Sequence, residues 1–552
     1  MEVSMNVKVV SSLEKVFATK EPVELKTAVT LLQNDFTAFQ VAFRLDDQER
    51  RSICRVSVDS PIADLITVRQ VEQVPVRNVG PNTIDGDWLS EEPGLYPDLL
   101  QPGRVNGSYI VGNHQWNAFW FEVETKEDTP AGTYDVELTF EVGSVFNKNA
   151  VSARVVVPVT VYGAVLPKQT LKRTEWFHPD CVADYYKVEV FSEEHWKLME
   201  EQAAFAAKRG INMLLTPLFT YPLDVDCAER TTSQLVEVTV RNGEYSFGFD
   251  LFRRWIDMAK RCGFEYFEMS HLFSQGGAVN ATKIMATVDG EYKQIFGPED
   301  LSTSEAYLTF LSKMLPELVA VIRELGIAEK TVFHIADEPP LDKLPVYKTL
   351  KEAMMPYIGE FDIIDALSDY DFYQDGVCEH PVVASNHVTP FLEGETPEDF
   401  WIYNCVAQWN KVANRFIAMP SYRNRIMAEQ IYKYDVDGVL HWGYNFYNAI
   451  GSAYKTDPFG STDCGGGYPA GDPFSVYPGD DGKPWPSIRL EVLWEAMCDL
   501  RAFKLLESLT DKDFVMSLIE AEGEVTFFDY PRNADYILKL RQKVNAEIAK
   551  RV

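Results

Sequence analysis

The sequence predicts a multidomain protein with an N-terminal antiparallel β-sandwich over residues 1–165. A (β/α)8 barrel of the TIM type, with a C-terminal extension, is predicted over residues 166–552. Two observations predict this arrangement. The first part contains many short runs in which apolar and polar residues alternate, with no convincing helical pattern between them. After about residue 170, strand-like and helix-like segments alternate, which is typical of parallel β/α units. At 552 residues, the chain is long enough for two to four domains.

The N-terminal part is predicted to be all-β because its runs repeat with a period of two. At 134–142, apolar residues such as Tyr134 and Val136 alternate with acidic and hydroxyl side chains. This predicts a strand with one buried face and one solvent-exposed face. A linker around 164–170, broken by Pro167, ends this part. The other runs that fit strands are 22–30, 35–44, 52–58, 64–76, 116–124 and 151–162.

The second part is predicted to be a barrel because it offers eight strand-like runs with helices between most of them. The clearest helix spans 303–325, where leucines recur every three or four residues, and Ser302 with Glu305 has the spacing of a capping box. Helices are also predicted at 194–209 and 488–510. The predicted barrel strands are 171–177, 211–216, 265–270, 331–336, 362–367, 381–385, 400–405 and 437–442.

A long loop at 443–488 follows the eighth predicted barrel strand. It is rich in glycine, proline, aspartate and aromatic residues. Loops of this length inside a compact domain are usually functional or disordered, and the aromatic side chains favour an ordered, functional loop. We expect it to lie over the carboxyl end of the barrel, where this fold places its active sites. The tail, 511–552, is predicted to contain a short strand-like piece and a helix.

The most informative feature is the pair Asp337–Glu338 at the end of the fourth predicted barrel strand. Residues 331–340 read Thr-Val-Phe-His-Ile-Ala-Asp-Glu-Pro-Pro, an apolar run that ends in two carboxylates and is stopped by two prolines. Two close carboxylates do not both ionise easily, so one stays protonated near neutral pH and can act as a general acid. Adjacent acids are also common in solvated turns, but the apolar strand and neighbouring His334 favour a functional pair.

Other polar and aromatic side chains are predicted to gather at the same end of the barrel. They suit a neutral polyhydroxy ligand, because polar side chains hydrogen-bond its hydroxyls and an aromatic ring stacks on the sugar. Any one of them is more often a packing residue than a catalytic one, so the interpretation depends on their convergence. They are Trp176, His178, His271, Asp369, Asp371, Asn386, His387, Tyr403, Asn404, His441, Trp442, Tyr444 and Asn445.

A zinc site made from His271, His334, Asp337 and His441 is a competing interpretation. The sequence lacks the H-x-H and H-E-x-x-H spacings that would support it, so we predict neither a metal nor another cofactor. The glycine run at 465–467 has no following Lys and Ser or Thr, so it does not match a phosphate-binding P-loop.

The composition excludes several classes of partner. The net charge is −31, from 83 acidic and 52 basic residues, and such a surface repels nucleic acids and anionic membranes. The first 30 residues show no apolar leader segment and no run approaches a membrane span of about 20 residues. We therefore expect a cytoplasmic protein, or a secreted or periplasmic one whose leader was removed. Free, mostly buried thiols are expected for the scattered cysteines Cys54, Cys181, Cys227, Cys262, Cys378, Cys405, Cys464 and Cys498.

Four ordered motifs resemble glycoside hydrolase family 123. The resemblance covers about 170–510, and the β-sandwich before the barrel also fits this family. The motifs are His-Ile-Ala-Asp-Glu-Pro (334–339), Leu-His-Trp-Gly-Tyr-Asn (440–445), Gly-Asp-Pro-Phe-Ser-Val-Tyr-Pro-Gly (471–479) and Ser-Ile-Arg-Leu-Glu (487–491).

The resemblance implies an exo-acting, retaining β-N-acetylgalactosaminidase that acts on glycans or glycoconjugates, glycosphingolipids among them. The 2-acetamido oxygen of the substrate is then the nucleophile, and an oxazolinium intermediate forms. Glu338 is implied to be the general acid and base, and Asp337 to orient the acetamido group and stabilise the positive intermediate. We expect Asp337 to be charged and Glu338 protonated at rest. Because neighbours on a strand point to opposite faces, the backbone must bend at this pair.

The remaining site assignments follow from the same resemblance. A tyrosine hydroxyl is expected on the acetamido oxygen, from Tyr403 or Tyr444, and Trp442 is expected to wall the sugar. The other predicted substrate-binding or shaping residues are Asn445, Asp472, His271, Trp176 and His334. Three alternatives stay open: a hydrolase of another 2-acetamido sugar, a glycan-binding relative without catalysis, and a metal-dependent hydrolase of another class.

Overall fold

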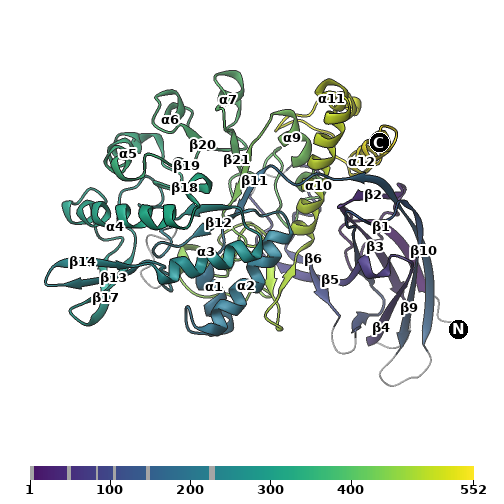
Figure 1. The fold of residues 1–552 in the computed structure, drawn as a ribbon. Helices are drawn as coiled ribbons and strands as arrows, with labels where there is room; N and C mark the ends of the chain where they lie inside the picture. Colours follow the sequence, from purple (N-terminus) through teal and green to yellow (C-terminus); the bar gives the residue numbers. More distant parts are fainter. Residues whose placement is uncertain (1–4, 47–50, 82–84, 104–106, 144–149, 223–229) are drawn as a thin grey trace.

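The computed structural model describes residues 5–46, 51–81, 85–103, 107–143, 150–222 and 230–552. A β-sandwich is followed by a closed barrel of eight parallel strands with helices around it, which confirms the predicted fold class. Figure 1 shows the sandwich in purple and blue at one side and the barrel in teal and green at the other. The described cysteines are all free thiols, and Cys227 lies outside the described residues.

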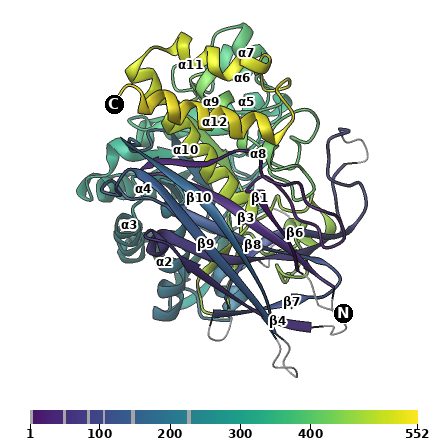
Figure 2. The same cartoon turned by 90° about the vertical axis from the view of Figure 1, so that its right-hand side faces the viewer.

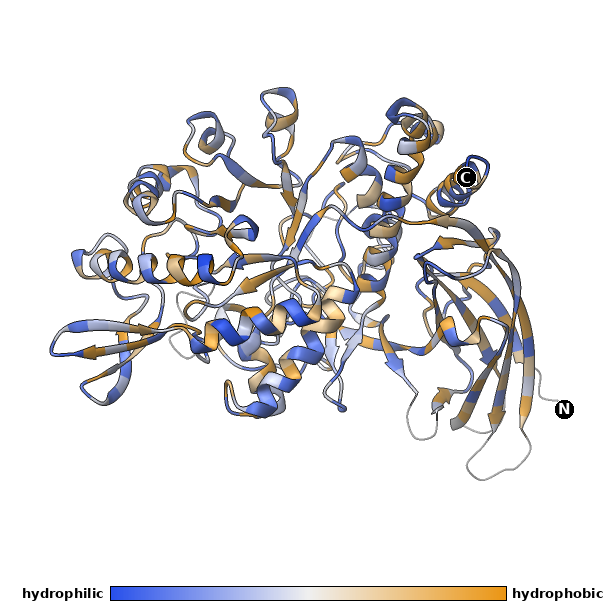
Figure 3. Ribbon diagram, viewed as in Figure 1, coloured by the Kyte–Doolittle hydropathy of each residue, from blue (hydrophilic) through white to orange (hydrophobic). Residues whose placement is uncertain are grey.

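Two five-stranded sheets form the sandwich. One contains, in spatial order, β1 (Met5–Ser11), β3 (Phe36–Leu45), β8 (Trp116–Glu124), β5 (Ile66–Val76) and β6 (Gly94–Pro102). The other contains β2 (Val29–Gln33), β10 (Val151–Val165), β9 (Gly132–Gly143), β4 (Arg51–Asp59) and β7 (Ser108–Gly112). Neighbouring strands are antiparallel, except that β2 and β10 are parallel. Apolar and polar residues alternate along these strands (Figure 3), as the period of two predicted.

Several sandwich strands differ from the prediction. The strand expected at 22–30 starts only at Val29, and β1, β6 and β7 were not predicted. In β6, Pro97 and Pro102 speak against a strand, because proline cannot donate to a ladder. The structure places β6 at the edge of its sheet, where a missing donor is tolerated.

Each barrel strand overlaps a predicted one, and β22 pairs back with β11 to close the barrel. The strands are β11 (Lys172–Glu175), β12 (Met213–Thr216), β15 (Tyr266–Met269), β18 (Thr331–Phe333), β19 (Asp362–Leu367), β20 (His380–Ala384), β21 (Trp401–Tyr403) and β22 (Gly438–His441). The helices of this part are α1 (Pro179–Tyr186), α2 (Glu193–Lys208), α3 (Asp250–Cys262), α4 (Glu305–Glu324), α5 (Leu344–Ile358), α6 (Asp371–Gln374), α7 (Thr389–Glu393), α8 (Tyr422–Arg425), α9 (Met427–Lys433) and α10 (Ile488–Leu509). Within the described ranges, no helix combines the length and the apolar character needed to cross a membrane.

Two local predictions are corrected. The cap of α4 is Ser304, whose hydroxyl accepts a hydrogen bond from the backbone N–H of Tyr307, and not Ser302, which is buried before the helix. The tail has no strand-like piece among its described residues: it forms α11 (Lys512–Ile519) and α12 (Ala534–Ala549).

The loops that follow β12 and β15 form an additional four-stranded sheet. Its order is β14 (Glu244–Gly248), β13 (Glu237–Arg241), β16 (Ile284–Val288) and β17 (Glu291–Phe296), and it projects from the barrel in Figure 1. The sequence analysis did not predict it, because these short runs interrupt the β/α alternation. The loop after β22 is ordered and contains a small hairpin, β23 (Val476–Pro478) and β24 (Pro484–Pro486).

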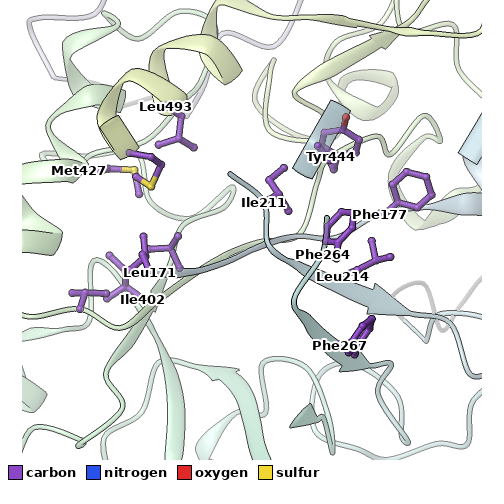
Figure 4. Close-up of a cluster of buried hydrophobic side chains, with 14 of the residues drawn as sticks. Leu171, Phe177, Ile211, Leu214, Phe264, Phe267, Ile402, Met427, Tyr444 and Leu493 are labelled. Atoms are coloured by element: carbon purple, nitrogen blue, oxygen red, sulfur yellow. The ribbon is translucent and has the colours of Figure 1, made fainter. Parts of the chain in front are cut away.

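One hydrophobic cluster spans the sandwich and the barrel. α10 lies between them, and α12 lies across β2 and β10 of the sandwich (Figures 1 and 2). The cluster includes Leu13 and Trp120 from the sandwich and Leu493 from α10. Figure 4 shows part of it between the barrel strands and α10. The sandwich is therefore packed against the barrel as part of one body, not tethered as a separate module.

Candidate active site

A pocket of about 180 Å³ opens at the carboxyl ends of the barrel strands. Its walls are largely aromatic, and its polar groups come from segments that directly follow different strands. The aromatic lining residues are Trp176, Tyr403, Trp442, Phe446 and Tyr468. The other lining side chains that carry polar or reactive groups are His178, Gln275, Asp337, Glu338 and Cys405. Such a mixture suits a small polyhydroxy ligand.

The backbone turns sharply at the acid pair. β18 ends at Phe333, four residues before Asp337, and Glu338 has a φ angle of +43°. The left-handed backbone conformation costs about 1–3 kcal/mol for a residue other than glycine. Such strain is concentrated at functional sites. The backbone N–H of Glu338 donates to the carbonyl of Ala366 (3.0 Å), which fixes the turn to the neighbouring strand β19. This turn lets both consecutive carboxylates line one pocket.

Each carboxylate has its own hydrogen-bond partner. The Nε2 amide of Gln275 donates to Oδ2 of Asp337 (2.8 Å), and the Tyr403 hydroxyl donates to Oε1 of Glu338 (2.7 Å). The Asp337 side chain is buried, whereas Glu338 is exposed. The two acids therefore share the pocket but differ in their contact with solvent.

The electrostatics of the pair reverse the predicted protonation. Burial, followed by the charge of Glu338, raises the pKa of Asp337 well above its usual range. In the free enzyme, the first proton taken up by the pair is therefore held at Asp337. The sequence analysis placed it on Glu338, because adjacency alone does not tell which acid is buried.

A buried imidazolium lies beneath the acids. His334 directs Nε2 at Oε1 of Glu268 (2.6 Å) and Nδ1 at Oδ1 of Asp365 (3.1 Å). Burial opposes the charged ring, but these two carboxylates outweigh it and raise the pKa of His334 to about 10. Glu268 also accepts a hydrogen bond from the indole N–H of Trp176 (2.8 Å), so this layer also fixes one wall of the pocket.

His271 completes this layer from β15. Its ring stacks on His334, with centroids 4.2 Å apart, and is buried beneath Trp176. Burial and the neighbouring imidazolium hold the pKa of His271 well below its usual range, so this ring is neutral. His271 thus supports the pocket from behind and does not line it.

These contacts disfavour the zinc interpretation. His271, His334 and Asp365 do bring ligand atoms within 4.8 Å of one another. However, both nitrogens of His334 donate to carboxylates, and a protonated imidazole cannot bind a metal. The fourth residue of the predicted set, His441, points its Nδ1 at Arg415 (2.8 Å).

The comparisons with known proteins identify the family. The model of the glycoside hydrolase 123 catalytic domain matches residues 176–506, which include the pocket and its acids. The chain belongs to glycoside hydrolase family 123. This confirms the resemblance carried by the four motifs, and the family is one of glycosidases. No curated protein sequence matches the chain.

One solved structure shares the fold of this chain over nearly its whole length. A family 123 glycoside hydrolase from Clostridium perfringens, studied for glycolipid glycan hydrolysis, is 15% identical over 99% of this chain and 98% of its own, with a TM-score of 0.73. A family 5 mannosidase from Rhizomucor miehei is 12% identical over 60% and 94% of the two chains (TM-score 0.33). A β-glucuronidase from Parabacteroides merdae is 9% identical over 91% and 51% (TM-score 0.29). The last two are too dissimilar to support an argument.

Among the predicted side chains, those that line the pocket of this family 123 enzyme are Asp337, Glu338, Tyr403, Trp176, Trp442 and His178. Their assigned roles stay predictions. The other predicted side chains do not line this pocket.

Three of these predicted residues, Tyr444, Asn445 and Asp472, are buried and make contacts outside the pocket. The Tyr444 hydroxyl donates to the carbonyl of Gln202 (3.1 Å), inside the cluster of Figure 4. Asn445 is fully buried and accepts from the backbone N–H of His178 (2.7 Å). Asp472 is also fully buried and accepts from the indole N–H of Trp442 (2.8 Å). Which side a residue faces depends on the local backbone beyond β22, and the sequence does not show it.

Gln275 is the main site residue that the sequence analysis missed. It lies in the loop between β15 and β16, where the backbone N–H of Gly276 donates to the carbonyl of Asp337 (2.9 Å). A single glutamine carries no catalytic signature, and its loop belongs to the additional sheet that was not predicted. The two glycines at 276 and 277, in the loop after a barrel strand, were the available signal of a close backbone approach.

The two tyrosines provide a matched test of this geometry. Tyr403→Phe removes a hydrogen bond to a carboxylate, so we expect kcat/KM to fall about 10- to 100-fold. Tyr444→Phe removes a buried hydroxyl that does not line the pocket, so the free energy of unfolding falls by about 1 kcal/mol while kcat and KM stay within about twofold. Steady-state kinetics and thermal unfolding of both variants check this. A changed KM for Tyr444→Phe would contradict the placement.

His334→Gln tests the buried imidazolium. Because the folded pKa of about 10 exceeds the ordinary value of 6.5, the stability due to this charge is complete below pH 6.5 and is lost as the pH rises towards 10. The difference in Tm between the wild type and His334→Gln is therefore largest at pH 6 and shrinks by pH 9.5. If the variant does not fold, the ¹⁵N shifts of the wild-type imidazole at pH 8 report the same charge. A neutral ring, or a Tm lowered by EDTA, would favour the metal interpretation.

Proposed function

We propose that this enzyme is an exo-acting, retaining β-N-acetylgalactosaminidase that removes terminal β-linked N-acetylgalactosamine by substrate-assisted catalysis. One observation carries the proposal: the carboxylates that line the pocket, among the described residues, come from the consecutive positions 337 and 338. A retaining enzyme with its own nucleophile needs two carboxyl groups that act on different sides of the sugar. Two adjacent acids on one turn fit a mechanism in which the sugar supplies the nucleophile.

The proposed reaction balances with these two residues. The acetamido carbonyl oxygen attacks C1, the glycosidic C1–O bond breaks, and Glu338 gives its proton to the leaving oxygen. Asp337 accepts the acetamido N–H and stabilises the positive oxazolinium. Water then attacks C1 and gives a proton to Glu338, and the acetamido group is restored. Both displacements invert C1, so the product keeps the β configuration.

Substrate binding accounts for the protonation that this reaction needs. The acetamido N–H can only donate, and a hydrogen bond to a charged carboxylate favours its ionised form. The bound sugar therefore favours an ionised Asp337 and leaves the proton of the pair for Glu338, the solvent-exposed acid. The Tyr403 hydroxyl, which contacts Glu338, orients it towards the leaving oxygen.

The pocket walls support removal of a single terminal sugar. Trp176, Trp442 and Tyr468 enclose a small volume, and aromatic faces pack against the C–H faces of a sugar ring. The preference for N-acetylgalactosamine over another 2-acetamido sugar comes from the family resemblance. A panel of aryl glycosides that differ at carbons 2 and 4 tests this preference, and binding without turnover would indicate a non-catalytic relative.

Substitution of the two acids tests the mechanism. We expect Glu338→Gln and Asp337→Asn each to lower kcat/KM about 10²- to 10⁴-fold on aryl N-acetyl-β-galactosaminides. The fall in kcat/KM for Glu338→Gln should be larger for substrates with poorer leaving groups, because their departure depends most on protonation by the general acid. Asp342→Asn, which changes an exposed acid outside the pocket, is the control and should stay within about twofold. Full activity of Glu338→Gln would refute the proposal, as would the absence of inhibition by a thiazoline analogue of the intermediate.

We further propose that the aglycone can be a lipid. Val279, Leu301 and Leu341 have exposed fractions of 37%, 59% and 42%. Leu341 follows Glu338 by three residues, and Val279 follows Gln275 by four, so both lie in loops that carry a pocket-lining residue. Ser302 donates its backbone N–H to the carbonyl of Val279 (3.0 Å), which joins two of them. We call these three residues the apolar rim.

A comparison of two substrates tests the apolar rim. Leu301→Gln and Leu341→Gln should lower kcat/KM on a micellar glycolipid about tenfold, because about 1.4 kcal/mol of apolar burial is lost. The same variants should leave kcat/KM on an aryl glycoside unchanged. Val23→Gln, which changes an exposed apolar residue in the N-terminal part of the chain, is the control. An equal effect on both substrates would contradict a lipid-binding role.

A further inference from the structure

A buried ion pair connects the sandwich to the start of α10. Nε of Arg489 donates to Oδ1 of Asp98 (2.8 Å), and Nη2 donates to Oδ2 (2.9 Å). Asp98 lies on β6 and is fully buried, and Arg489 is 2% exposed. The Tyr477 hydroxyl also donates to Asp98 (2.6 Å). This two-point pairing fixes the orientation of the guanidinium as well as its charge.

The same guanidinium holds the segment 471–474. Nη1 of Arg489 donates to the carbonyls of Gly471 (2.6 Å) and Phe474 (2.9 Å), which flank Asp472 on both sides. The segment packs tightly against the chain just after β22. A Cβ atom at Gly443 would come within 2.4 Å of the Pro473 carbonyl oxygen, so only glycine fits there without a shift. The backbone around Asp472 therefore has little freedom to shift.

Asp472 links this constrained segment to the wall of the pocket. Its Oδ2 accepts the indole N–H of Trp442 (2.8 Å), and Trp442 lines the pocket, where its ring packs edge-on against Phe446 (5.1 Å) and Tyr468 (5.6 Å). A continuous set of hydrogen bonds thus runs from the sandwich to a wall of the sugar pocket: Asp98, Arg489, the 471–474 carbonyls, Asp472 and Trp442.

A second contact from the sandwich reaches the same segment. Lys15, which is buried, donates to the carbonyl of Ile417 (2.6 Å), and the backbone N–H of Ile417 donates to the carbonyl of Ala470 (2.9 Å). Apolar side chains of the sandwich, including Trp88 and Tyr96, pack in the cluster that also contains Phe474. The sandwich therefore contacts this segment through both polar and apolar groups.

We propose that Asp98 and Arg489 are positioning residues for the sugar pocket, and that the N-terminal sandwich is a structural part of the active site. The inference rests on the proposed function of the pocket, and it gives the 471–479 and 487–491 motifs a physical role. If Asp98 loses its charge, Arg489 is left as an uncompensated buried cation. The 471–474 segment then relaxes, and Trp442 leaves the position that fits the sugar.

The test compares three variants below their melting temperatures. Asp98→Asn keeps the size but removes the charge, and Arg489→Lys keeps the charge but cannot bridge Asp98 and two carbonyls. Glu122→Gln is the matched control, because Glu122 also joins the sandwich to the barrel, through Arg209 (3.1 Å), but does not touch the 471–474 segment. Each variant is labelled with 5-fluorotryptophan, and the Trp442 resonance is assigned from the spectrum of Trp442→Phe.

We expect Asp98→Asn and Arg489→Lys to shift the ¹⁹F resonance of Trp442 and to lower kcat/KM about 10- to 100-fold. Glu122→Gln should lower Tm while leaving this resonance unchanged and kcat/KM within about twofold. The inference is overturned if the resonance is unchanged in the first two variants, or if kcat/KM follows Tm alike in all three. If Asp98→Asn does not fold, Arg489→Lys carries the test. Because the resonance is read without substrate, it tests the inference even if the wild type hydrolyses no 2-acetamido sugar.

Discussion

The left-handed turn at Glu338 is the constraint on which the site depends. On a regular strand, consecutive side chains point to opposite faces, so Asp337 and Glu338 would not line one cavity. The positive φ at Glu338 and its hydrogen bond to Ala366 bring both acids to the pocket. The turn also separates their environments, because Asp337 becomes buried and Glu338 stays exposed. That asymmetry allows two neighbouring carboxyl groups to play different chemical roles.

Layers of paired charges support the strained turn and the aromatic walls. His334 lies between Glu268 and Asp365 beneath the acids, and Glu268 also holds Trp176. Behind another wall residue, Asp472 accepts a hydrogen bond from the indole N–H of Trp442. Buried charges are costly unless they are paired, so the loss of one member is expected to disturb the whole layer. In this enzyme, these contacts fix the positions of the pocket-lining side chains.

Much of the fold could be predicted from the sequence, because its signals are periodic. The eight barrel strands and the long helices appear as repeated apolar patterns, and four motifs identified the family. What failed depends on tertiary context. The edge strand β6 carries prolines that speak against a strand, and the additional sheet around β13 interrupts the expected alternation.

The site was predictable to the level of the acid pair and part of the walls. Trp442 and Tyr444 are two residues apart, yet one lines the pocket and the other is buried in the core. The motif contains both residues but does not show which one faces the pocket. Gln275 carried no motif at all, and only its approach to Asp337 in space identifies it.

The central claim is that the acetamido oxygen of the sugar is the nucleophile, and a series of fluorinated N-acyl substrates tests it most directly. Aryl β-galactosaminides with acetyl, fluoroacetyl, difluoroacetyl and trifluoroacetyl groups differ little in size but progressively weaken this oxygen as a nucleophile. The account predicts that kcat/KM falls steeply along the series. A rate that is independent of fluorination would contradict it and would require a nucleophile from the protein.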